Sequence, residues 1–358
     1  MYRNKLEKLR KEIDILDEQL IEILDNRMAI VQEIGKLKRG AKSAIYKPER
    51  ERYIIERLIK NHKGRLSRSA IEAVLLEVFA ISRHYELPEV IAYLGPEGSF
   101  THQAAESRFG ALAEYLALDS IRAVFESVDT GRARFGVVPL ENNQEGLVNE
   151  TLDLLGTTDL LITAEIPLSI HFAFATKCER LADIKKIYSR DIGFRQCKKF
   201  IKDSFLNNHV ELIPVNSTSK AVQIAKNEKN SAALCSHIAA RMNDLPILFD
   251  NVEDSSDNFT RFLIIGKDIK NEVSGHDKTS LLAKTPDKPG SLLVLLKDFY
   301  NEGINMTKLE SRPAKKGKTF KYLFYVDIDG HIDDENVARV MEKHKKALKW
   351  LGSYVKLC

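Results

Sequence analysis

Apolar residues recur at three- and four-residue steps along the first forty positions of the chain. This stripe consists of Leu6, Leu9, Ile13, Leu16, Leu20, Ile23, Leu24, Met28, Val31 and Ile34. The spacing predicts one amphipathic helix over residues 5–39, about 50 Å long at ~1.5 Å per residue. A helix of that length cannot bury its stripe against one short partner, so it requires two further helices or a second chain. Helices at about 48–62 and 67–86 follow, and Leu87-Pro88 ends the helical region.

From Val90 onwards the pattern changes to short apolar strands that alternate with helices. The predicted strands lie at 90–94, 135–140, 160–166, 170–175, 210–214, 232–235 and 262–265. This alternation predicts an α/β domain with largely parallel sheets. The polar stretch 267–278 is interpreted as a linker.

The last stretch predicts a third unit. Its elements are a strand at 279–285, a helix at 291–302, strands at 304–312 and 320–328, a helix at 333–350 and a strand at 352–357. This is the βαββαβ order of a ferredoxin-like fold. The basic run Lys315-Lys316-Gly317-Lys318 is interpreted as a solvated hairpin tip. We therefore predict a multidomain protein with domains at 1–88, 89–268 and 277–358.

Composition indicates an ordinary soluble protein, with 44% hydrophobic and 30% charged residues. The four cysteines, Cys178, Cys197, Cys235 and Cys358, are scattered and are expected to be reduced thiols. The charged N-terminal helix follows no apolar signal segment, and no apolar run is long enough to span a bilayer. We expect a cytoplasmic protein with no membrane partner.

The net charge of +4 is spread unevenly, since residues 1–88 carry 19 Lys and Arg against 14 Asp and Glu. A basic end could attract nucleic acid. Here acidic residues alternate with the basic ones, which favours a solvated helix face, so we expect no nucleic-acid partner.

Cations on the first helix suggest a site for a small dicarboxylate. Lys38 lies 11 residues after Arg27, which at ~100° per residue leaves the two side chains only ~20° apart and ~16 Å apart along the axis. Arg10 is about a quarter-turn off that face, so it could join the cluster of a partner chain in an antiparallel dimer. Spacing alone leaves open that all three are ordinary exposed charges.

The surrounding residues resemble the all-helical chorismate mutase family. The motifs are Leu9-Arg10, Leu16-Asp17, Leu24, Arg27, Val31, Gly35-Lys36, Lys38, Arg50-Glu51-Arg52, Ser82 and Glu86. The resemblance implies a domain-swapped helical dimer that binds chorismate. It also implies that Arg27 and Arg50 hold substrate carboxylates and that Arg10 arrives from the partner chain. By the same resemblance Lys38 donates to the ether oxygen, Glu51 contacts the ring hydroxyl and Ser82 lines the pocket.

Two positions depart from the pattern of that family. Lys47 stands where some relatives have Asp, and Glu86 stands where many have Gln. A carboxylate cannot donate a hydrogen bond to the ether oxygen, whereas a carboxylic acid can. We therefore expect Glu86 to act in its protonated form; the alternative is that Glu86 only ends its helix in solvent.

Three polar loops at strand ends of the α/β region suggest one shared cleft. They are Gly95–Thr101, Pro139–Gly146 and Asn258–Phe262. His102 and His171 are isolated and are expected to be structural. We expect no metal and no cofactor, because the sequence contains no HExxH motif, Cys/His cluster or Ser/His/Asp order.

Residues 90–268 resemble prephenate dehydratase. The motifs are Tyr93–Thr101, Val138–Asn142, Thr151–Leu155, Gln196-Cys197, Ser217-Thr218 and Asn258–Phe262. The resemblance implies two α/β lobes, as in periplasmic binding proteins, with prephenate between them. It assigns Thr260 as the donor to the departing hydroxyl, Arg261 as a carboxylate partner and Phe262 as a residue that shapes the cleft. Thr101, Asn142 and Gly146 would line the opposite wall. A structural ion pair is the open alternative for Arg261, and Asn143 and Arg190-Asp191 depart from the family pattern.

The C-terminal unit resembles the ACT regulatory domain of these enzymes. The matching segments are Asp287–Leu293 and Gly303–Pro313. The resemblance implies that phenylalanine binds at a dimer interface and inhibits the enzyme. The residues expected to bind it are Gly290, Ser291, Leu292, Leu293, Glu310, Ser311, Arg312 and Pro313. We thus expect a homo-oligomer, a dimer through its helical and ACT domains.

The expected function is a bifunctional enzyme of phenylalanine biosynthesis that converts chorismate to prephenate and prephenate to phenylpyruvate. Two alternatives remain open at this point. One is a dehydratase with an inactive or weak mutase domain, because of Lys47 and Glu86. The other is a non-catalytic ligand-binding regulator, which the presence of Arg27, Lys38 and Thr260 disfavours.

Overall fold

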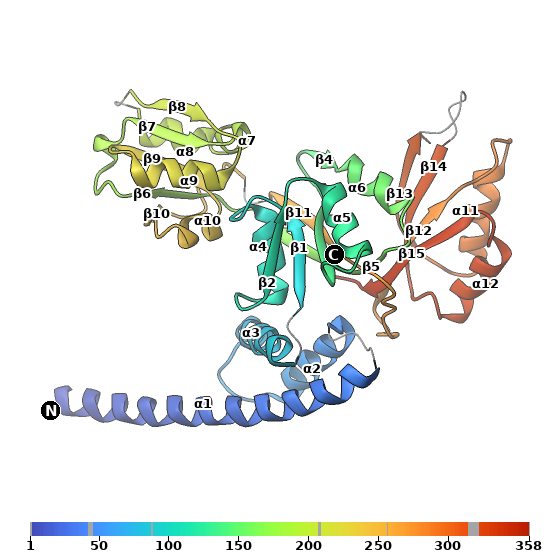
Figure 1. The fold of residues 1–358 in the computed structure, drawn as a ribbon, viewed down its shortest axis with the longest axis horizontal. Helices are drawn as coiled ribbons and strands as arrows, with labels where there is room; N and C mark the ends of the chain where they lie inside the picture. Colours follow the sequence, from blue (N-terminus) through green and yellow to red (C-terminus); the bar gives the residue numbers. More distant parts are fainter. Residues whose placement is uncertain are drawn as a thin grey trace.

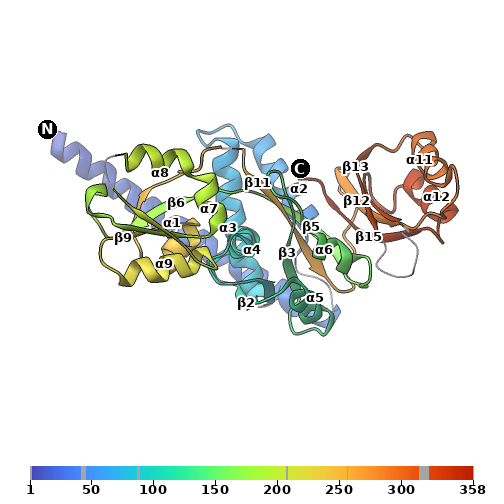
Figure 2. The same ribbon diagram turned by 90° about the horizontal axis from the view of Figure 1, so that it is seen from above.

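The computed structural model describes residues 2–41, 46–86, 89–206, 209–255, 257–313 and 322–357. The predicted end of the helical region at Leu87-Pro88 and the predicted hairpin tip Lys315–Lys318 lie outside these ranges. A helical region, two α/β lobes and a C-terminal sheet with two helices follow one another along the chain (Figure 1). The second lobe and the C-terminal sheet lie on opposite sides of the first lobe (Figure 2).

The helical region consists of α1 (Tyr2–Ala41), α2 (Pro48–Asn61) and α3 (Arg68–Glu86). The long first helix is confirmed, and it projects far beyond the other two (Figure 1). Its C-terminal half packs on α3, where Met28 and Val31 are buried. The stripe of the N-terminal half remains exposed in this protomer, with 53% of Leu20 accessible. An exposed apolar stripe of this kind is uncommon on a single soluble chain.

The first lobe is built on a mixed sheet with the strand order β2-β1-β3-β11-β5. Its strands are β1 (Val90–Leu94), β2 (Glu114–Leu118), β3 (Phe135–Asn142), β4 (Gly146–Leu147), β5 (Leu161–Ser169) and β11 (Phe259–Gly266). Its helices are α4 (Phe100–Phe109), α5 (Ile121–Asp129) and α6 (Asn149–Leu155).

The second lobe carries a sheet with the order β10-β6-β9-β7-β8. The strands are β6 (Ala173–Thr176), β7 (Lys186–Ser189), β8 (Glu211–Pro214), β9 (Ser231–Cys235) and β10 (Ile247–Phe249). The helices are η1 (Leu181–Asp183), α7 (Asp191–Gln196), α8 (Lys198–Ser204), α9 (Thr218–Asn227) and α10 (His237–Met242). The chain enters this lobe after β5 and leaves it before β11, so two crossing segments join the lobes.

The prediction of largely parallel sheets is wrong, because both sheets are mixed. In the first lobe β1 runs parallel to β2 and β3, but β11 inserts antiparallel between β3 and β5. The reason is the connection between lobes. A strand that returns from the second lobe enters the sheet from the end at which β5 left it, and apolar periodicity does not encode that direction.

The C-terminal unit has the predicted βαββαβ order. Its elements are β12 (Asp277–Ala283), α11 (Ser291–Asn301), β13 (Met306–Pro313), β14 (Tyr322–Asp329), α12 (Glu335–Lys343) and β15 (Leu348–Val355). The antiparallel strand order is β13-β14-β12-β15. The last helix is shorter than predicted, because β15 begins at Leu348 and packs on β5. At Gly352 a Cβ would lie 2.1 Å from the Ile162 carbonyl oxygen, so this contact requires glycine.

The C-terminal unit shares a core with the first lobe. Leu282, Tyr325 and Tyr354 pack in one apolar cluster with residues of β1, β3, α5 and β11. The predicted linker is ordered as well, since Asn271 is buried and donates to the carbonyl oxygens of Thr163 and Ser353 at 2.7 and 2.9 Å. The first lobe and the C-terminal sheet therefore form one continuous packing unit.

Candidate active sites

Four of the residues predicted for the mutase pocket meet where α1 crosses α3. The Arg27 guanidinium donates to Ser82 Oγ and lies 5.9 Å from the centre of the Phe79 ring. One turn further along α3, Lys38 Nζ is 2.6 Å from Glu86 Oε1. Arg27 and Lys38 therefore both face α3, as the ~100° rotation per residue predicted. Burial lowers the pKa of Arg27 from its ordinary value.

A glycine allows the two helices to approach this closely. A Cβ at Gly35 would lie 2.4 Å from the carbonyl oxygen of Glu86. A larger residue would push α3 away from α1 and separate Lys38 from Glu86.

The remaining predicted mutase residues do not join this cluster in one protomer. Arg10 is exposed on the projecting part of α1, and Arg50 is exposed with its guanidinium 5.4 Å from the Tyr53 ring. Glu51 forms an ion pair with Arg83 of α3 instead. Arg10 was expected from a partner chain, so its position here leaves that prediction untested. The expected contact of Glu51 with the ring hydroxyl of the substrate likewise stays a prediction.

Arg83 was missed by sequence reasoning, although it joins the helices to the first lobe. Besides Glu51, its guanidinium donates to the carbonyl oxygen of Arg108 at the end of α4 and stacks 5.3 Å from the Tyr46 ring. Tyr46 is buried, with ring centres 5.3 and 5.8 Å from Phe109 and Phe135. Burial raises the pKa of Tyr46 to about 12, and burial also raises the pKa of Glu51, against the opposing charge of Arg83.

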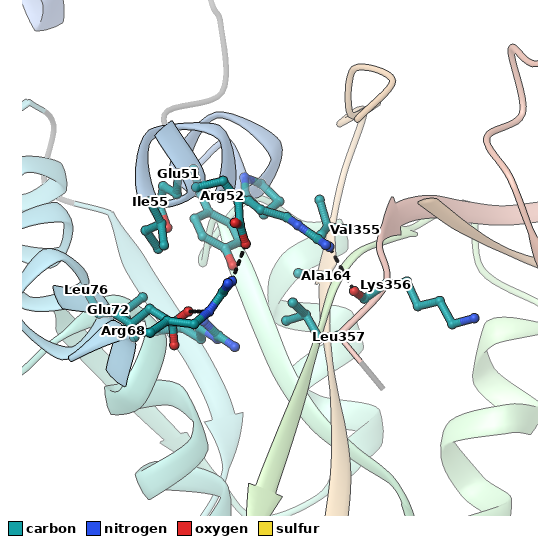
Figure 3. Close-up of a pocket in the computed structure, with 14 residues that line it drawn as sticks. Glu51, Arg52, Ile55, Arg68, Glu72, Leu76, Ala164, Val355, Lys356 and Leu357 are labelled. Carbon is teal, nitrogen blue, oxygen red and sulfur yellow. Dashed lines mark hydrogen bonds and ion pairs between the residues drawn. The ribbon is translucent and has the colours of Figure 1, made fainter. Parts of the chain in front are cut away.

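A cavity of about 380 Å³ lies beside Glu51, between α2, α3 and the C-terminal segment. Figure 3 shows Arg52 reaching across it to the Lys356 carbonyl oxygen, at 3.1 Å, while Arg68 pairs with Glu72 within α3. The cavity is lined by side chains of both charges, and the helical region thus touches both the first lobe and the end of the chain.

The predicted dehydratase residues Asn142 and Thr260 lie opposite each other on β3 and β11. Asn142 Nδ2 donates to Thr260 Oγ1 at 2.8 Å and to Asn258 Oδ1 at 2.9 Å. Asn142 Oδ1 accepts from the backbone amides of Gln144 and Glu145, both at 2.9 Å. The amide of Asn142 is thus fixed in one orientation and directs the Thr260 hydroxyl, which is only 8% exposed.

Gln196, at the end of α7 in the second lobe, contacts the loops beside Asn142 and Thr260. Gln196 Oε1 accepts from Asn258 Nδ2, and Gln196 Nε2 donates to Gln144 Oε1, both at 2.9 Å. The predicted Gln-Cys motif therefore contacts the same loops as Asn142 and Thr260, from the opposite lobe.

The loop Gly95–Thr101 also spans the lobes. The Gly98 carbonyl oxygen accepts from Ser236 Oγ of the second lobe at 2.5 Å. Gly98 has φ 74°, and a Cβ there would lie 2.3 Å from Ser219 Oγ, so this close contact requires glycine. Thr101 is buried at the start of α4. The ring of His102 stacks on Tyr93, with ring centres 4.6 Å apart, and burial lowers the pKa of His102.

Two predicted cleft residues have other surroundings. Arg261 is buried, and its guanidinium donates to Glu165 at 2.8 Å, Asp327 at 2.9 Å, Glu141 at 3.1 Å and the Tyr354 hydroxyl at 2.9 Å. The structural ion pair, left open as an alternative, is what this structure contains. The donors of Arg261 are thus engaged by groups far apart in the sequence, and its expected carboxylate-binding role stays a prediction. Phe262 is a core residue packed with Ile264 and Ile166.

Gly146 and Asn142 line a cavity of about 580 Å³ between the β3–β4 loop and the C-terminal unit. Lys308 of β13 lies on its other wall and forms an ion pair with Glu141. This contact was not foreseen from the sequence, because nothing marks Lys308 apart from other lysines.

The predicted effector segments lie at the start of α11 and along β13. Gly290 has φ 82° and precedes α11, and Leu293 is 66% exposed. Along β13 the side chains alternate, so Glu310 and Arg312 are half-buried whereas Ser311 and Pro313 are exposed.

Comparisons with known proteins identify both catalytic regions. A family model described as prephenate dehydratase matches residues 91–270, and one described as chorismate mutase type II matches residues 9–87. The bifunctional chorismate mutase/prephenate dehydratase of Aquifex aeolicus (strain VF5) is 40% identical over 360 residues, covering 98% of each chain.

Solved structures resemble the part of the chain outside the helices. Prephenate dehydratase from Arthrobacter aurescens in complex with L-Phe has a TM-score of 0.67 at 30% identity, over 75% of this chain and 90% of that chain. GqqA, a quorum-quenching acylase, has the same TM-score at 25% identity, over 75% of this chain and 98% of that chain. Since similar folds carry different activities, the family assignment depends on the full-length sequence match.

The fold, with its helical region and its two α/β lobes, is that of a multidomain enzyme. The chain belongs to the family of bifunctional chorismate mutase/prephenate dehydratases. It therefore combines an isomerase and a lyase of aromatic amino acid biosynthesis.

The part of the chain that the structure describes contains neither a membrane-spanning helix nor a metal-binding cluster. None of the helices there combines the length and apolar composition needed to cross a bilayer. Within the same part of the chain, no group of three or more His, Cys, Asp or Glu side chains is arranged to hold a metal ion.

Proposed function

We propose that the mutase reaction takes place at the crossing of α1 and α3, with Arg27 and Lys38 as its central cations. The observation that supports this is their convergence on Ser82 and Glu86. Chorismate rearranges to prephenate without a nucleophile. The site has to select a compact conformer of the substrate and stabilise negative charge that grows on the ether oxygen. Arg27 would bind a carboxylate, and Lys38, with Glu86 beside it, would donate to the ether oxygen.

A second chain would complete this pocket. The exposed stripe of α1 supports a helical dimer, because a partner helix would bury side chains such as Leu20. Arg10 would then reach the partner's pocket. Arg50 and Glu51 of α2 would turn toward the substrate, for a carboxylate and the ring hydroxyl.

The dehydratase reaction is assigned to the interlobe region around Thr260. Prephenate loses CO₂ and its ring hydroxyl, the C–C and C–O bonds break, and the departing hydroxide takes up a proton to leave as water. Because Asn142 donates to Thr260 Oγ1, the hydroxyl proton of Thr260 points away from Asn142 and can bond to the departing oxygen. Thr101, Asn142 and Gly146 would line the pocket, with Phe262 supporting it from the core.

Residues 277–358 would form an ACT domain that binds phenylalanine and inhibits the enzyme. The βαββαβ order supports this, as does the helix start at Gly290 and Ser291, whose amides could receive a carboxylate. Leu292, Leu293 and the segment Glu310–Pro313 would complete the site at a dimer interface. The described relative from Arthrobacter aurescens binds L-Phe, which supports this ligand. We place the enzyme in the cytoplasm, with domains at 1–88, 89–268 and 277–358.

Separate assays test these assignments. Turnover of chorismate and of prephenate is measured with and without phenylalanine at millimolar concentration. We expect both substrates to react and phenylalanine to slow the dehydratase. Unchanged rates with phenylalanine would refute the sensor role. Failure on chorismate alone would indicate a dehydratase with an inactive mutase region.

A further inference from the structure

The sheet of the first lobe carries cleft residues on one face and an ion-pair network on the other. Thr260 is registered opposite Asn142, and Arg261 opposite Glu141. Neighbouring residues of a strand point to opposite faces of the sheet. Asn142 and Thr260 therefore share one face, whereas Glu141 and Arg261 share the other, on which they contact the C-terminal unit; at the strand end, Asn142 also lines the cavity beside that unit.

Two basic side chains of β13 cross to the first lobe and contact it on either side of one loop. Lys308 forms an ion pair with Glu141, the residue directly before Asn142. Arg312 donates to Asn149 Oδ1 at the start of α6, and its Nη2 is 3.3 Å from Asp153 Oδ1. Between these contacts runs the segment 143–148 (the loop 143–148), which contains the β3–β4 turn and the short strand β4, so β13 contacts the chain on both sides of it.

The turn between β3 and β4 is open to solvent on one side. Residues 143–146 are exposed, and a Cβ at Gly146 would meet no atom within 4 Å. The cavity of about 580 Å³ separates this loop from Lys308 and the rest of the C-terminal wall. A displacement of either end would therefore change the position of Asn142 without a clash on that side.

The contact at Glu141 joins charged groups. Burial alone would raise the pKa of Glu141, but the hydrogen bond and charge of Lys308, together with Arg261, hold that pKa below its ordinary value. The carboxylate is thus charged, and both of its hydrogen bonds are charge-assisted. Without Lys308, Glu141 would keep only the pull of Arg261, which lies on the neighbouring strand.

We propose that β13 is a positioning strand for the dehydratase: Lys308 and Arg312 fix the loop 143–148, and thereby the hydrogen bond between Asn142 and Thr260. This inference rests on the proposed function, because β13 also carries the predicted effector residues Glu310 and Ser311. Phenylalanine bound there would shift β13 and alter the loop through these two contacts.

The test compares Lys308→Met with Lys308→Arg and with Lys345→Met, in the full chain. Lys345 is exposed on the same unit and pairs only with nearby Glu342 among the contacts described, which makes it a matched control. Each variant is assayed on prephenate and on chorismate, with and without phenylalanine. Phenylalanine binding is followed separately by calorimetry and by the emission of Trp350, the single tryptophan of the chain.

We expect Lys308→Met to lower dehydratase kcat by about tenfold. A displacement of about 1 Å of a group in an active site can lower the rate by up to ~100-fold. The mutase rate should stay unchanged, and Lys308→Arg should restore most of the loss. Phenylalanine should still bind, while its effect on dehydratase turnover shrinks by at least about fivefold. Wild-type turnover with wild-type inhibition in Lys308→Met would overturn the proposal.

Two further results separate the proposals from each other. If phenylalanine does not bind the unaltered enzyme, the proposed phenylalanine-binding role of the C-terminal unit is wrong. The effect of Lys308→Met on dehydratase kcat still tests the positioning role of β13. Should Lys308→Met not fold, Asp153→Asn removes part of the second contact from the lobe side. A normal response to phenylalanine and normal kcat in that variant would count against β13 as the connecting strand.

Discussion

At the scale of single residues, the hydroxyl of Thr260 carries the most specific prediction. Thr260→Val keeps the shape of the side chain but removes the donor and the acceptor for Asn142 Nδ2. We expect dehydratase kcat to fall by about 10²-fold or more, as for the loss of a positioned acid. The measurement is the initial rate on prephenate, with the chorismate rate of the same preparation as control. Thr260→Ser should retain most activity, and an active Thr260→Val enzyme would exclude this residue as the donor.

Glu86 carries a prediction about the donor to the ether oxygen. Glu86 Oε1 lies 2.6 Å from Lys38 Nζ, and a carboxylate accepts hydrogen bonds but cannot donate one. Glu86→Gln replaces the carboxylate with an amide, which can donate, so mutase turnover should be retained or rise. The dehydratase rate of the same variant serves as control. A loss of mutase turnover in Glu86→Gln would show that the carboxylate itself is needed beside Lys38.

The raised pKa of Glu89, at the junction of the helical region and the first lobe, predicts how the free energy of unfolding depends on pH. Burial raises the pKa of Glu89 to about 7 from its ordinary value of 4.5, against the pull of Arg134. The folded protein thus keeps a proton that the unfolded chain releases. The contribution of this proton to the free energy of unfolding is fully present below pH 4.5 and is lost as the pH rises through about 7. Glu89→Gln should weaken this loss, which urea unfolding at pH 5 and pH 8 would show. An equal loss in both proteins would assign the pH effect to other groups.

At the scale of elements, α1 predicts a pocket shared between two chains. Arg27 lies in the α1–α3 crossing of its own chain, whereas Arg10 is on the projecting half. Arg10→Ala and Arg27→Ala should each lose mutase activity. Mixed after subunit exchange, they should recover about a quarter of the normal rate, since random pairing gives half mixed dimers with one intact pocket each. No recovery after proven exchange would mean that both arginines serve one chain.

The elements also show what the sequence could reveal. The pairing of Arg27 and Lys38 followed from helical geometry, which depends on neighbours within one helix. The network of Arg261 could not be foreseen, because its partners Glu141, Glu165 and Asp327 come from three other strands. The same holds for Glu51 and Arg83: both were visible as charges, but only the packing of α2 on α3 brings them together.

At the scale of the whole molecule, the shared core predicts that dehydratase and C-terminal unit unfold together. Leu282, Tyr325 and Tyr354 belong to the same apolar cluster as the first lobe, and Asn271 ties the intervening segment to both. Trp350 reports on the C-terminal unit alone, because it is the only tryptophan. On heating, the change in its emission should coincide with the loss of prephenate turnover, as expected for one cooperative unit. The helical region has a smaller contact with the lobe, through Arg83 and Tyr46, so mutase activity provides an independent comparison. A Trp350 transition well below the loss of dehydratase activity would show that the C-terminal unit melts on its own, and that the buried network around Arg261 does not join the two.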